Sequence, residues 1–119
     1  MVLCHGSSGE YWHPAHLLVH SAVKGLMSDS PVAWFTFLAH DPDHPIQRLV
    51  NRDDAAFLTI DTSEQSEQRQ QALQCHESQL SLFGKFAGGD YRDFIRKTSI
   101  ESYGCPTGTS LLEEESQDS

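Results

Sequence analysis

Basic side chains, paired cysteines and long apolar runs are all scarce in this sequence of 119 residues. With 8 Lys and Arg against 17 Asp and Glu, the chain has a formal net charge of −9. Nucleic acid is therefore not expected as a partner, because contacts to phosphates need clustered basic side chains. No apolar run approaches the roughly 18 to 20 residues of a transmembrane helix. Residues 1–9 also lack the basic and apolar regions of a signal peptide.

The cysteines give no sign of disulfide or CxxC chemistry. Cys4, Cys75 and Cys105 make an odd number at wide spacings. Free thiols of this kind suit a reducing compartment, so we expect a cytoplasmic protein. A cysteine nucleophile is not expected, because the histidines that directly follow Cys4 and Cys75 would point to the opposite face of a strand.

Short apolar runs alternate with segments of helical spacing along the chain. Strands are predicted at residues 2–4, 32–38, 56–60 and 98–103, and helices at 15–27, 64–79 and 90–96. Residues 40–54 are polar and hold Pro42 and Pro45, which predicts a loop. Alternation of this kind predicts an α/β layered domain with a mostly parallel sheet.

The number of elements is small for such a domain. A parallel sheet needs helices on both faces, and the predicted helices are enough to cover about half of an α/β sheet. We therefore expect residues 1–103 to be the later part of a larger α/β domain. Residues 104–119 carry four carboxylates in the last seven positions, and they predict an acidic, disordered tail.

The most informative segment is residues 9–16, Gly-Glu-Tyr-Trp-His-Pro-Ala-His. It lies where a strand gives way to a helix, and parallel sheets bind ligands beyond the carboxyl ends of their strands. His13 and His16 occupy positions i and i+3 and share one helix face, and neutral imidazole is the commonest metal ligand. His20 either joins them or faces the core. On spacing alone, two surface histidines are an equally good interpretation, since catalytic zinc usually has three protein ligands.

Two segments resemble signatures of the PIG-L/LmbE-type metal-dependent de-N-acetylases. Residues 9–16, followed by Val19 and Ala22-Val23, resemble the family's second signature, which runs Gly, any, Tyr, Gly, His, Pro, Asp, His. Residues 72–79, Ala-Leu-Gln-Cys-His-Glu-Ser-Gln, are similar to the family's late helix. Asp61 matches the usual entry to that helix. The two matches occur in the family's order.

The resemblance implies a partial Rossmann-like, LmbE-like fold for residues 1–103. It implies that His16 binds a zinc or another divalent ion, and that His13 polarises the amide carbonyl or protonates the leaving amine. The implied substrates are N-acetylglucosamine-type conjugates. If the chain is part of a longer PIG-L-like protein, the resemblance implies association with a membrane. The oligomeric state stays open.

The chain departs from the family pattern at three points. Ala15 stands where the family has an Asp that orients a neighbouring histidine or tunes its pKa. Trp12 stands where the family has a Gly. The first signature, Ala-His-Pro-Asp-Asp-Glu, which supplies two metal ligands and the general base, is absent. These departures predict reduced or altered catalysis.

A polar loop after the strand at 32–38 offers further candidate ligands. These are His40, Asp41, Asp43 and His44. Such a cluster can bind a cation. A solvated loop is the preferred interpretation, because loops commonly hold Asp, Pro and His.

Three functions are therefore compatible with the sequence. The leading one is a zinc-dependent amide hydrolase, truncated or divergent. The second is a non-catalytic remnant of the fold that acts by pairing with another chain. The third is a small metal-binding module built from His13, His16, His40 and His44.

Overall fold

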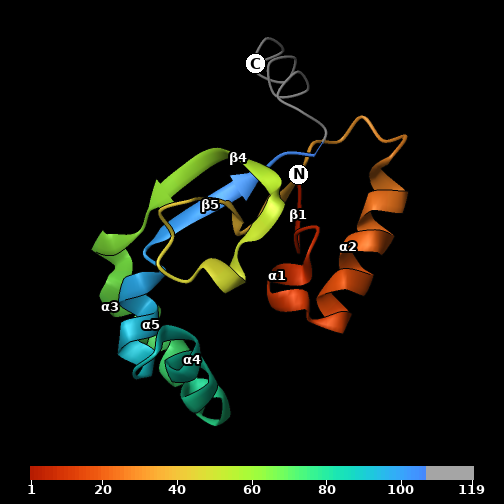
Figure 1. Ribbon diagram of the computed structural model, residues 1–119. Helices are drawn as coiled ribbons and strands as arrows, with labels where there is room; N and C mark the ends of the chain where they lie inside the picture. The colour runs from red at the N-terminus through yellow and green to blue at the C-terminus, as the bar shows by residue number, and fades with distance from the viewer. Residues whose placement is uncertain (107–119) are drawn as a thin grey trace. The chain divides into compact units, whose positions relative to one another are not determined.

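The computed structural model describes residues 1–106 (Figure 1). The strands are β1 (Val2–Cys4), β2 (Trp34–Phe37), β3 (Ala39–His40), β4 (Asn51–Asp61) and β5 (Ile100–Gly104). The helices are α1 (Gly9–Trp12), α2 (Pro14–Met27), α3 (Ser66–Gln74), α4 (Leu80–Ala87) and α5 (Tyr91–Lys97), with short 3-10 helices η1 (Gln47–Leu49), η2 (Ser63–Gln65) and η3 (Glu77–Gln79). The described chain divides into two compact units, residues 1–41, 48–58 and 102–106, and residues 42–47 and 59–101.

The first unit is built around β1, α2 and β2. The two strands pair in parallel, with Leu3 opposite Phe35, and α2 connects them as in a βαβ unit. Pro14 begins α2 at a position where its missing N–H costs no hydrogen bond. Trp34 and Phe35 are buried and form part of the core. The strand predicted at 2–4, the helix at 15–27 and the buried strand within 32–38 are confirmed.

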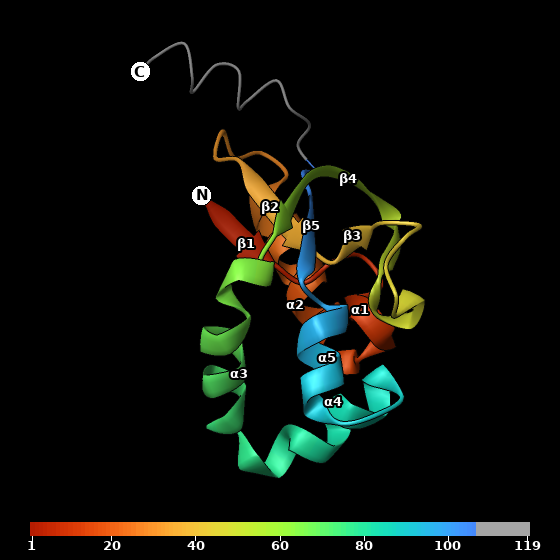
Figure 2. The same cartoon turned by 90° about the vertical axis from the view of Figure 1, so that its left-hand side faces the viewer.

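The five strands form one mixed sheet in the order β1-β2-β5-β4-β3 (Figure 2). The pairs β1–β2 and β3–β4 are parallel, whereas β5 runs antiparallel to β2, with Thr36 opposite Gly104. The prediction of an α/β fold is confirmed, but the sheet is only partly parallel. Strand direction depends on the path by which the chain re-enters the sheet, which an apolar pattern does not encode.

Residues 40–54 are not the continuous loop that was predicted. They contain part of β3, the helix η1 and the beginning of β4. Asn51 opens β4, pairs with Ala39 and donates its backbone N–H to the Leu38 carbonyl at 2.7 Å. The strand is hidden in the sequence because it opens with Asn-Arg-Asp-Asp, and Arg52 and Asp53 are exposed to solvent. The predicted strand at 56–60 is therefore only the later part of β4.

The helix predicted at 90–96 is confirmed in the second unit as α5. The Asp90 side chain accepts hydrogen bonds from the backbone N–H groups of Arg92 and Asp93, and the Asp93 side chain accepts from Asp90 N–H. This reciprocal capping box satisfies donors that a helix start leaves unpaired. The Phe83 and Phe94 rings pack α4 against α5 with centroids 4.9 Å apart.

The helix predicted at 64–79 is wrong beyond Gln74. The chain forms η2, α3, η3 and α4 in succession instead of one continuous helix. The N–H groups of Cys75 and His76 donate to carbonyls three residues earlier, at 3.2 and 2.9 Å. Hydrogen bonds of this shorter spacing tighten the last turn and end the helix. Good helix formers on both sides of the break concealed it.

The tail predicted from residue 104 starts too early. Gly104 is the last residue of β5, and a Cβ at this position would lie 2.9 Å from the Thr36 hydroxyl. The close approach of β2 explains why a residue without a side chain stands here. Residues 107–119, which hold the rest of the predicted tail, lie outside the described residues.

Part of the interior of the first unit is polar. Asn51, Thr36 and Ser102 are the largest fully buried side chains in the described chain. Ser102 donates to the Ala39 carbonyl at 2.8 Å, and Thr36 donates to the Asp54 carboxylate at 3.3 Å. Buried polar groups are costly without partners, so each of them marks a hydrogen-bond network. The largest of these networks surrounds the candidate site.

Candidate metal centre

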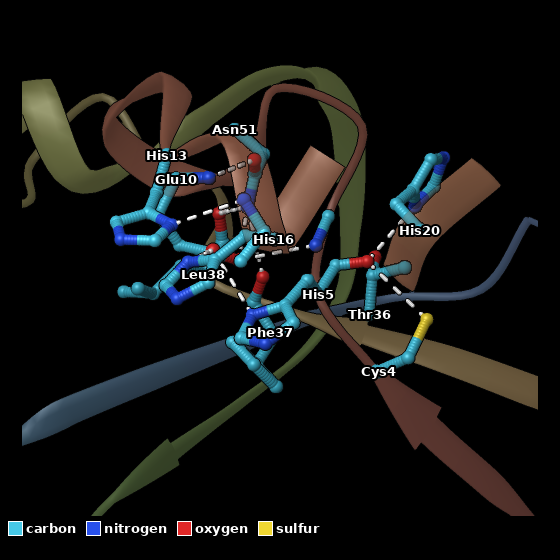
Figure 3. Close-up of polar contacts among 12 residues, drawn as sticks. Cys4, His5, Glu10, His13, His16, His20, Thr36, Phe37, Leu38 and Asn51 are labelled. Carbon is cyan, nitrogen blue, oxygen red and sulfur yellow. Dashed lines mark hydrogen bonds and ion pairs between the residues drawn. The ribbon is translucent and has the colours of Figure 1, made fainter. Parts of the chain in front are cut away.

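The candidate site lies at the carboxyl end of β1. His5 follows β1 directly, Glu10 lies on α1, and His16 lies in the first turn of α2. Figure 3 shows these three side chains gathered in one place. The junction between a strand and the helix of a βαβ unit is a common ligand position in α/β sheets.

The segment that carries Glu10 is an irregular turn. Gly9, Glu10 and Trp12 have φ angles of 57°, 60° and 63°. Glycine suits position 9 because it adopts positive φ without strain. It also leaves room for α2, since a Cβ at residue 9 would lie 3.0 Å from the Leu17 backbone nitrogen. Positive φ is unfavourable for Glu and Trp, and such strain persists only where the surrounding structure imposes it.

The Glu10 carboxylate is the centre of the site. Its side chain is 3% exposed, and its two oxygens face different partners. Oε1 accepts from the backbone N–H of Gly6 at 3.1 Å and from the Asn51 amide at 3.3 Å. Oε2 lies 3.2 Å from His5 Nδ1 and 2.8 Å from His16 Nδ1. One oxygen is therefore held by the protein, and the other is presented to two imidazoles.

The imidazole rings are stacked beside this carboxylate. The His5 and His16 rings are nearly parallel, at 7°, with centroids 3.8 Å apart. The His13 and His16 centroids lie 4.4 Å apart. Tyr11 contacts both His13 and His16 edge-on, with centroids 5.7 Å apart in each pair. The expectation that His13 and His16 share one face of the chain is met by this geometry.

The donor set of His5, Glu10 and His16 could hold a divalent cation. One ligand atom from each residue lies within 4.8 Å of the other two. Ligands at about 2.0–2.1 Å from a tetrahedral zinc lie about 3.3 Å apart. The separations of 3.2 and 2.8 Å between Glu10 Oε2 and the two Nδ1 atoms are hydrogen-bond distances, so a bound ion would replace the protons between these atoms. Two histidines and one glutamate also form a known ligand set of catalytic zinc.

His13 has a different position from the three donors. It is the N-cap residue of α2, and its Nδ1 accepts a hydrogen bond from Ala15 N–H at 3.2 Å. A neutral imidazole whose Nδ1 accepts carries its proton on Nε2. His13 therefore presents an N–H donor beside the His16 ring, which is the form that an electrophilic group needs to polarise a carbonyl; giving a proton to an amine needs the imidazolium form instead.

The other sequence candidates do not join this group. His20 Nδ1 lies 2.8 Å from the His5 carbonyl oxygen, so His20 supports the backbone of the site. His44 is buried, and its Nδ1 accepts from Ile46 N–H at 2.9 Å. Within residues 1–106, His5, Glu10 and His16 are the one cluster of three potential ligands, so His40, Asp41, Asp43 and His44 form none.

Cys4 precedes the site but is unsuited to be a nucleophile. It is buried, and its thiol donates to the His5 carbonyl at 3.2 Å. Burial, followed by the charges of Glu10 and Asp54, raises the pKa of the Cys4 thiol to about 11. The thiolate is the reactive form of cysteine, and it is therefore scarce at neutral pH.

Sequence reasoning identified His16 but missed its two partners. His5 was considered only as a base for Cys4, although a residue directly after a strand lies at the ligand-binding end of the sheet. Glu10 stands six positions before His16, a separation that suggests contact in neither a helix nor a strand. Only the irregular turn of α1 brings the carboxylate to the imidazoles.

No protein-family model, curated protein or solved structure matches this chain. None of the helices in residues 1–106 combines the length and hydropathy needed to cross a membrane. The donor set, its burial and its hydrogen bonds are therefore the basis for assigning a function.

Proposed function

We propose that this chain is a metal-dependent amide hydrolase that removes acetyl groups from N-acetylglucosamine-type conjugates, with zinc as its metal. The observation that carries the proposal is the His5–Glu10–His16 cluster, with the His13 ring stacked on His16. The substrate class follows from the resemblance of residues 9–16 and 72–79 to the PIG-L/LmbE de-N-acetylases. The βαβ unit, with the cluster at the carboxyl end of β1, supports an LmbE-like, Rossmann-like fold.

The chain's own residues would supply metal binding and a hydrogen-bond donor for the substrate. A bound divalent ion polarises a carbonyl and lowers the pKa of water, which are the needs of amide hydrolysis. His5, Glu10 and His16 would hold the ion through Nδ1, Oε2 and Nδ1. Neutral His13 would donate an Nε2–H hydrogen bond to the amide oxygen, and protonated His13 would give a proton to the departing amine. The buried Glu10 keeps its second oxygen bonded to the protein, so it would bind the ion through one oxygen.

This ligand set differs from the one that the resemblance implies. In the family, two ligands come from the first signature, which this sequence lacks. His5 and Glu10 would take their places from within the chain. His16 keeps the role that the resemblance gives it, and His13 remains the acid.

A second candidate is a metal-binding member of the fold without hydrolytic activity. Ala15 favours it, because the family has a carboxylate there, whereas the Ala15 side chain cannot orient a histidine. The carboxylate that contacts His16 is Glu10 instead. Both candidates predict a metal site, and they differ in whether amide bonds are cleaved.

The test uses the 119-residue chain and measures zinc and hydrolysis together. Zinc bound after dialysis is measured by atomic emission, and free amine released from an N-acetylglucosamine conjugate is measured by fluorescence. We expect about one zinc per chain for the unaltered protein and a large loss in His16→Ala, which removes a ligand. His13→Ala should keep the zinc and lose about 10²–10⁴-fold in rate, the usual contribution of a positioned acid.

Lys24→Ala is the control, because Lys24 is exposed on α2 and lies outside the cluster. It should leave both zinc content and rate unchanged. Zinc binding without amine release would favour the non-catalytic candidate. Absence of zinc binding, with the chain folded by circular dichroism, would overturn the metal centre and the hydrolase together.

A further inference from the structure

The largest fully buried side chain of the described residues is an amide, Asn51, which opens β4. Asn51 is 0% exposed and lies 41 positions from Glu10 in the sequence. Figure 3 shows Asn51 beside Glu10. An amide with four hydrogen-bonding positions is costly to bury, so its partners indicate what it does.

The hydrogen-bond partners of the Asn51 side chain lie in two short segments, residues 8–10 and 37–38. The oxygen Oδ1 accepts from Ser8 N–H, Ser8 Oγ and Glu10 N–H at 3.1, 2.7 and 3.0 Å. The nitrogen Nδ2 donates to the carbonyls of Phe37 and Leu38 at 3.0 and 3.1 Å, and to Glu10 Oε1 at 3.3 Å. These partners fix the orientation of the amide, because exchanging O and N would oppose donors to donors and acceptors to acceptors.

Both segments are strained at the residue that Asn51 contacts. Glu10 and Leu38 have φ angles of 60° and 53°, and they are two of the three non-glycine residues with positive φ among residues 1–106. Asn51 binds the backbone N–H of the first and the carbonyl of the second. Strained residues persist where the surrounding structure over-determines them, and they gather at functional sites.

We propose that Asn51 is the positioning residue of the metal centre. It holds the Glu10 backbone in its left-handed conformation and fixes Oε1, so that Oε2 is presented to His5 and His16. The role rests on the proposed function in one respect, namely that Glu10 is a metal ligand. Partners that orient a metal ligand commonly contribute 10- to 100-fold to metal affinity.

Two substitutions disturb the contact between Asn51 and Glu10, one at Asn51 itself and one at the neighbouring Gly6. Asn51→Asp keeps the accepting oxygen but places a carboxylate oxygen against Glu10 Oε1 and two carbonyls, where the native residue donates. Gly6→Ala leaves Asn51 intact, but its Cβ would collide with the side chains of Asn51 and Asp54 and displace both. We expect both variants to lose about 10- to 100-fold in Co²⁺ affinity, with a changed d–d absorption spectrum.

Asp54→Asn is the matched control. Asp54 lies on the same strand and accepts a hydrogen bond from Ser7 N–H in the same loop at 2.9 Å, but it is not hydrogen-bonded to Glu10. This variant should keep the Co²⁺ affinity and spectrum even if the thermal midpoint of unfolding falls. Equal losses of affinity in Asn51→Asp and Asp54→Asn would overturn the proposal, since Asn51 would then only stabilise the fold.

A double-mutant cycle with Glu10→Gln tests whether Asn51 acts through Glu10. If it does, Asn51→Asp has little further effect on Co²⁺ affinity once the carboxylate is gone. Additive losses would contradict the proposal. Loss of the folded state in both Asn51→Asp and Gly6→Ala would overturn it too, because the residue would then serve folding and not position.

A measurement without metal separates this proposal from the proposed function. In ¹H–¹⁵N spectra of the imidazole nitrogens, Asn51→Asp should shift the signals of His5 and His16 but not that of His76. Should the unaltered chain bind no Co²⁺, the hydrolase fails, yet these shifts still report whether Asn51 positions Glu10. Unchanged imidazole signals in a folded Asn51→Asp variant would refute the positioning role whatever the metal result.

Discussion

Glu10→Gln separates the charge of the central carboxylate from its shape. A glutamine has the same size and can keep an oxygen at the Oε1 position, where Gly6 and Asn51 donate at 3.1 and 3.3 Å. Its NH₂ group then takes the Oε2 position, 3.2 and 2.8 Å from the two imidazole nitrogens. An amide NH₂ group donates hydrogen bonds and offers no lone pair to a cation. The hydrogen bonds of the turn survive, and the metal loses one ligand of three.

The expected loss follows from the number of ligands. Zinc sites with four ligands bind with about 10–16 kcal/mol, or about 2.5–4 kcal/mol for each ligand. At about 1.4 kcal/mol per tenfold change, losing one ligand raises the zinc Kd by about two to three orders of magnitude. Competition with a chromogenic chelator measures this Kd, and a urea titration of the metal-free chain measures the free energy of unfolding.

The control is Glu67→Gln, an exposed glutamate on α3 that should leave the zinc Kd unchanged. An unchanged Kd in Glu10→Gln would refute the reasoning, because a buried carboxylate between two imidazoles would then contribute nothing to binding. An increased Kd that is matched by loss of the fold would refute it as well. In that case Glu10 would be needed for the turn and not for the metal.

Three further predictions concern Cys4 beside the site, Gly84 on α4 and Gly25 on α2. Because burial raises the pKa of Cys4 from its ordinary 9.0 to about 11, only the unfolded thiol ionises between these values. The contribution of the protonated Cys4 thiol to the free energy of unfolding is therefore complete below pH 9 and is lost as pH rises through the folded pKa. Urea titrations should show this decrease in the native chain and not in Cys4→Ala. Gly84→Ala should destabilise by about 1–3 kcal/mol, since its Cβ would lie 2.7 Å from the Gly89 carbonyl oxygen. Gly25→Ala on α2, where a Cβ would have no neighbour within 4 Å, should instead stabilise the chain by about 0.5–1 kcal/mol in the same titration. A destabilised Gly25→Ala or a neutral Gly84→Ala would contradict the packing around these two glycines.

Local patterns were reliable where one residue type decides the backbone. The helical spacing of residues 15–27 and 90–96 and the apolar run at 32–38 each predicted the correct type of element. The errors occurred where chemistry and secondary structure disagree. Asn51 and the charges after it concealed a strand, and the uninterrupted helix formers around Cys75 concealed a helix end.

The sequence alone determined the βαβ beginning of the chain and the placement of His13 and His16 at the start of its helix. Helical and strand periodicities are local, so neighbours along the chain suffice to specify them. Tertiary structure alone decided that His5, Glu10 and Asn51 belong to the same centre. Their contacts depend on a turn with positive φ and on a strand 41 positions further along the chain, and neither has a periodic signature.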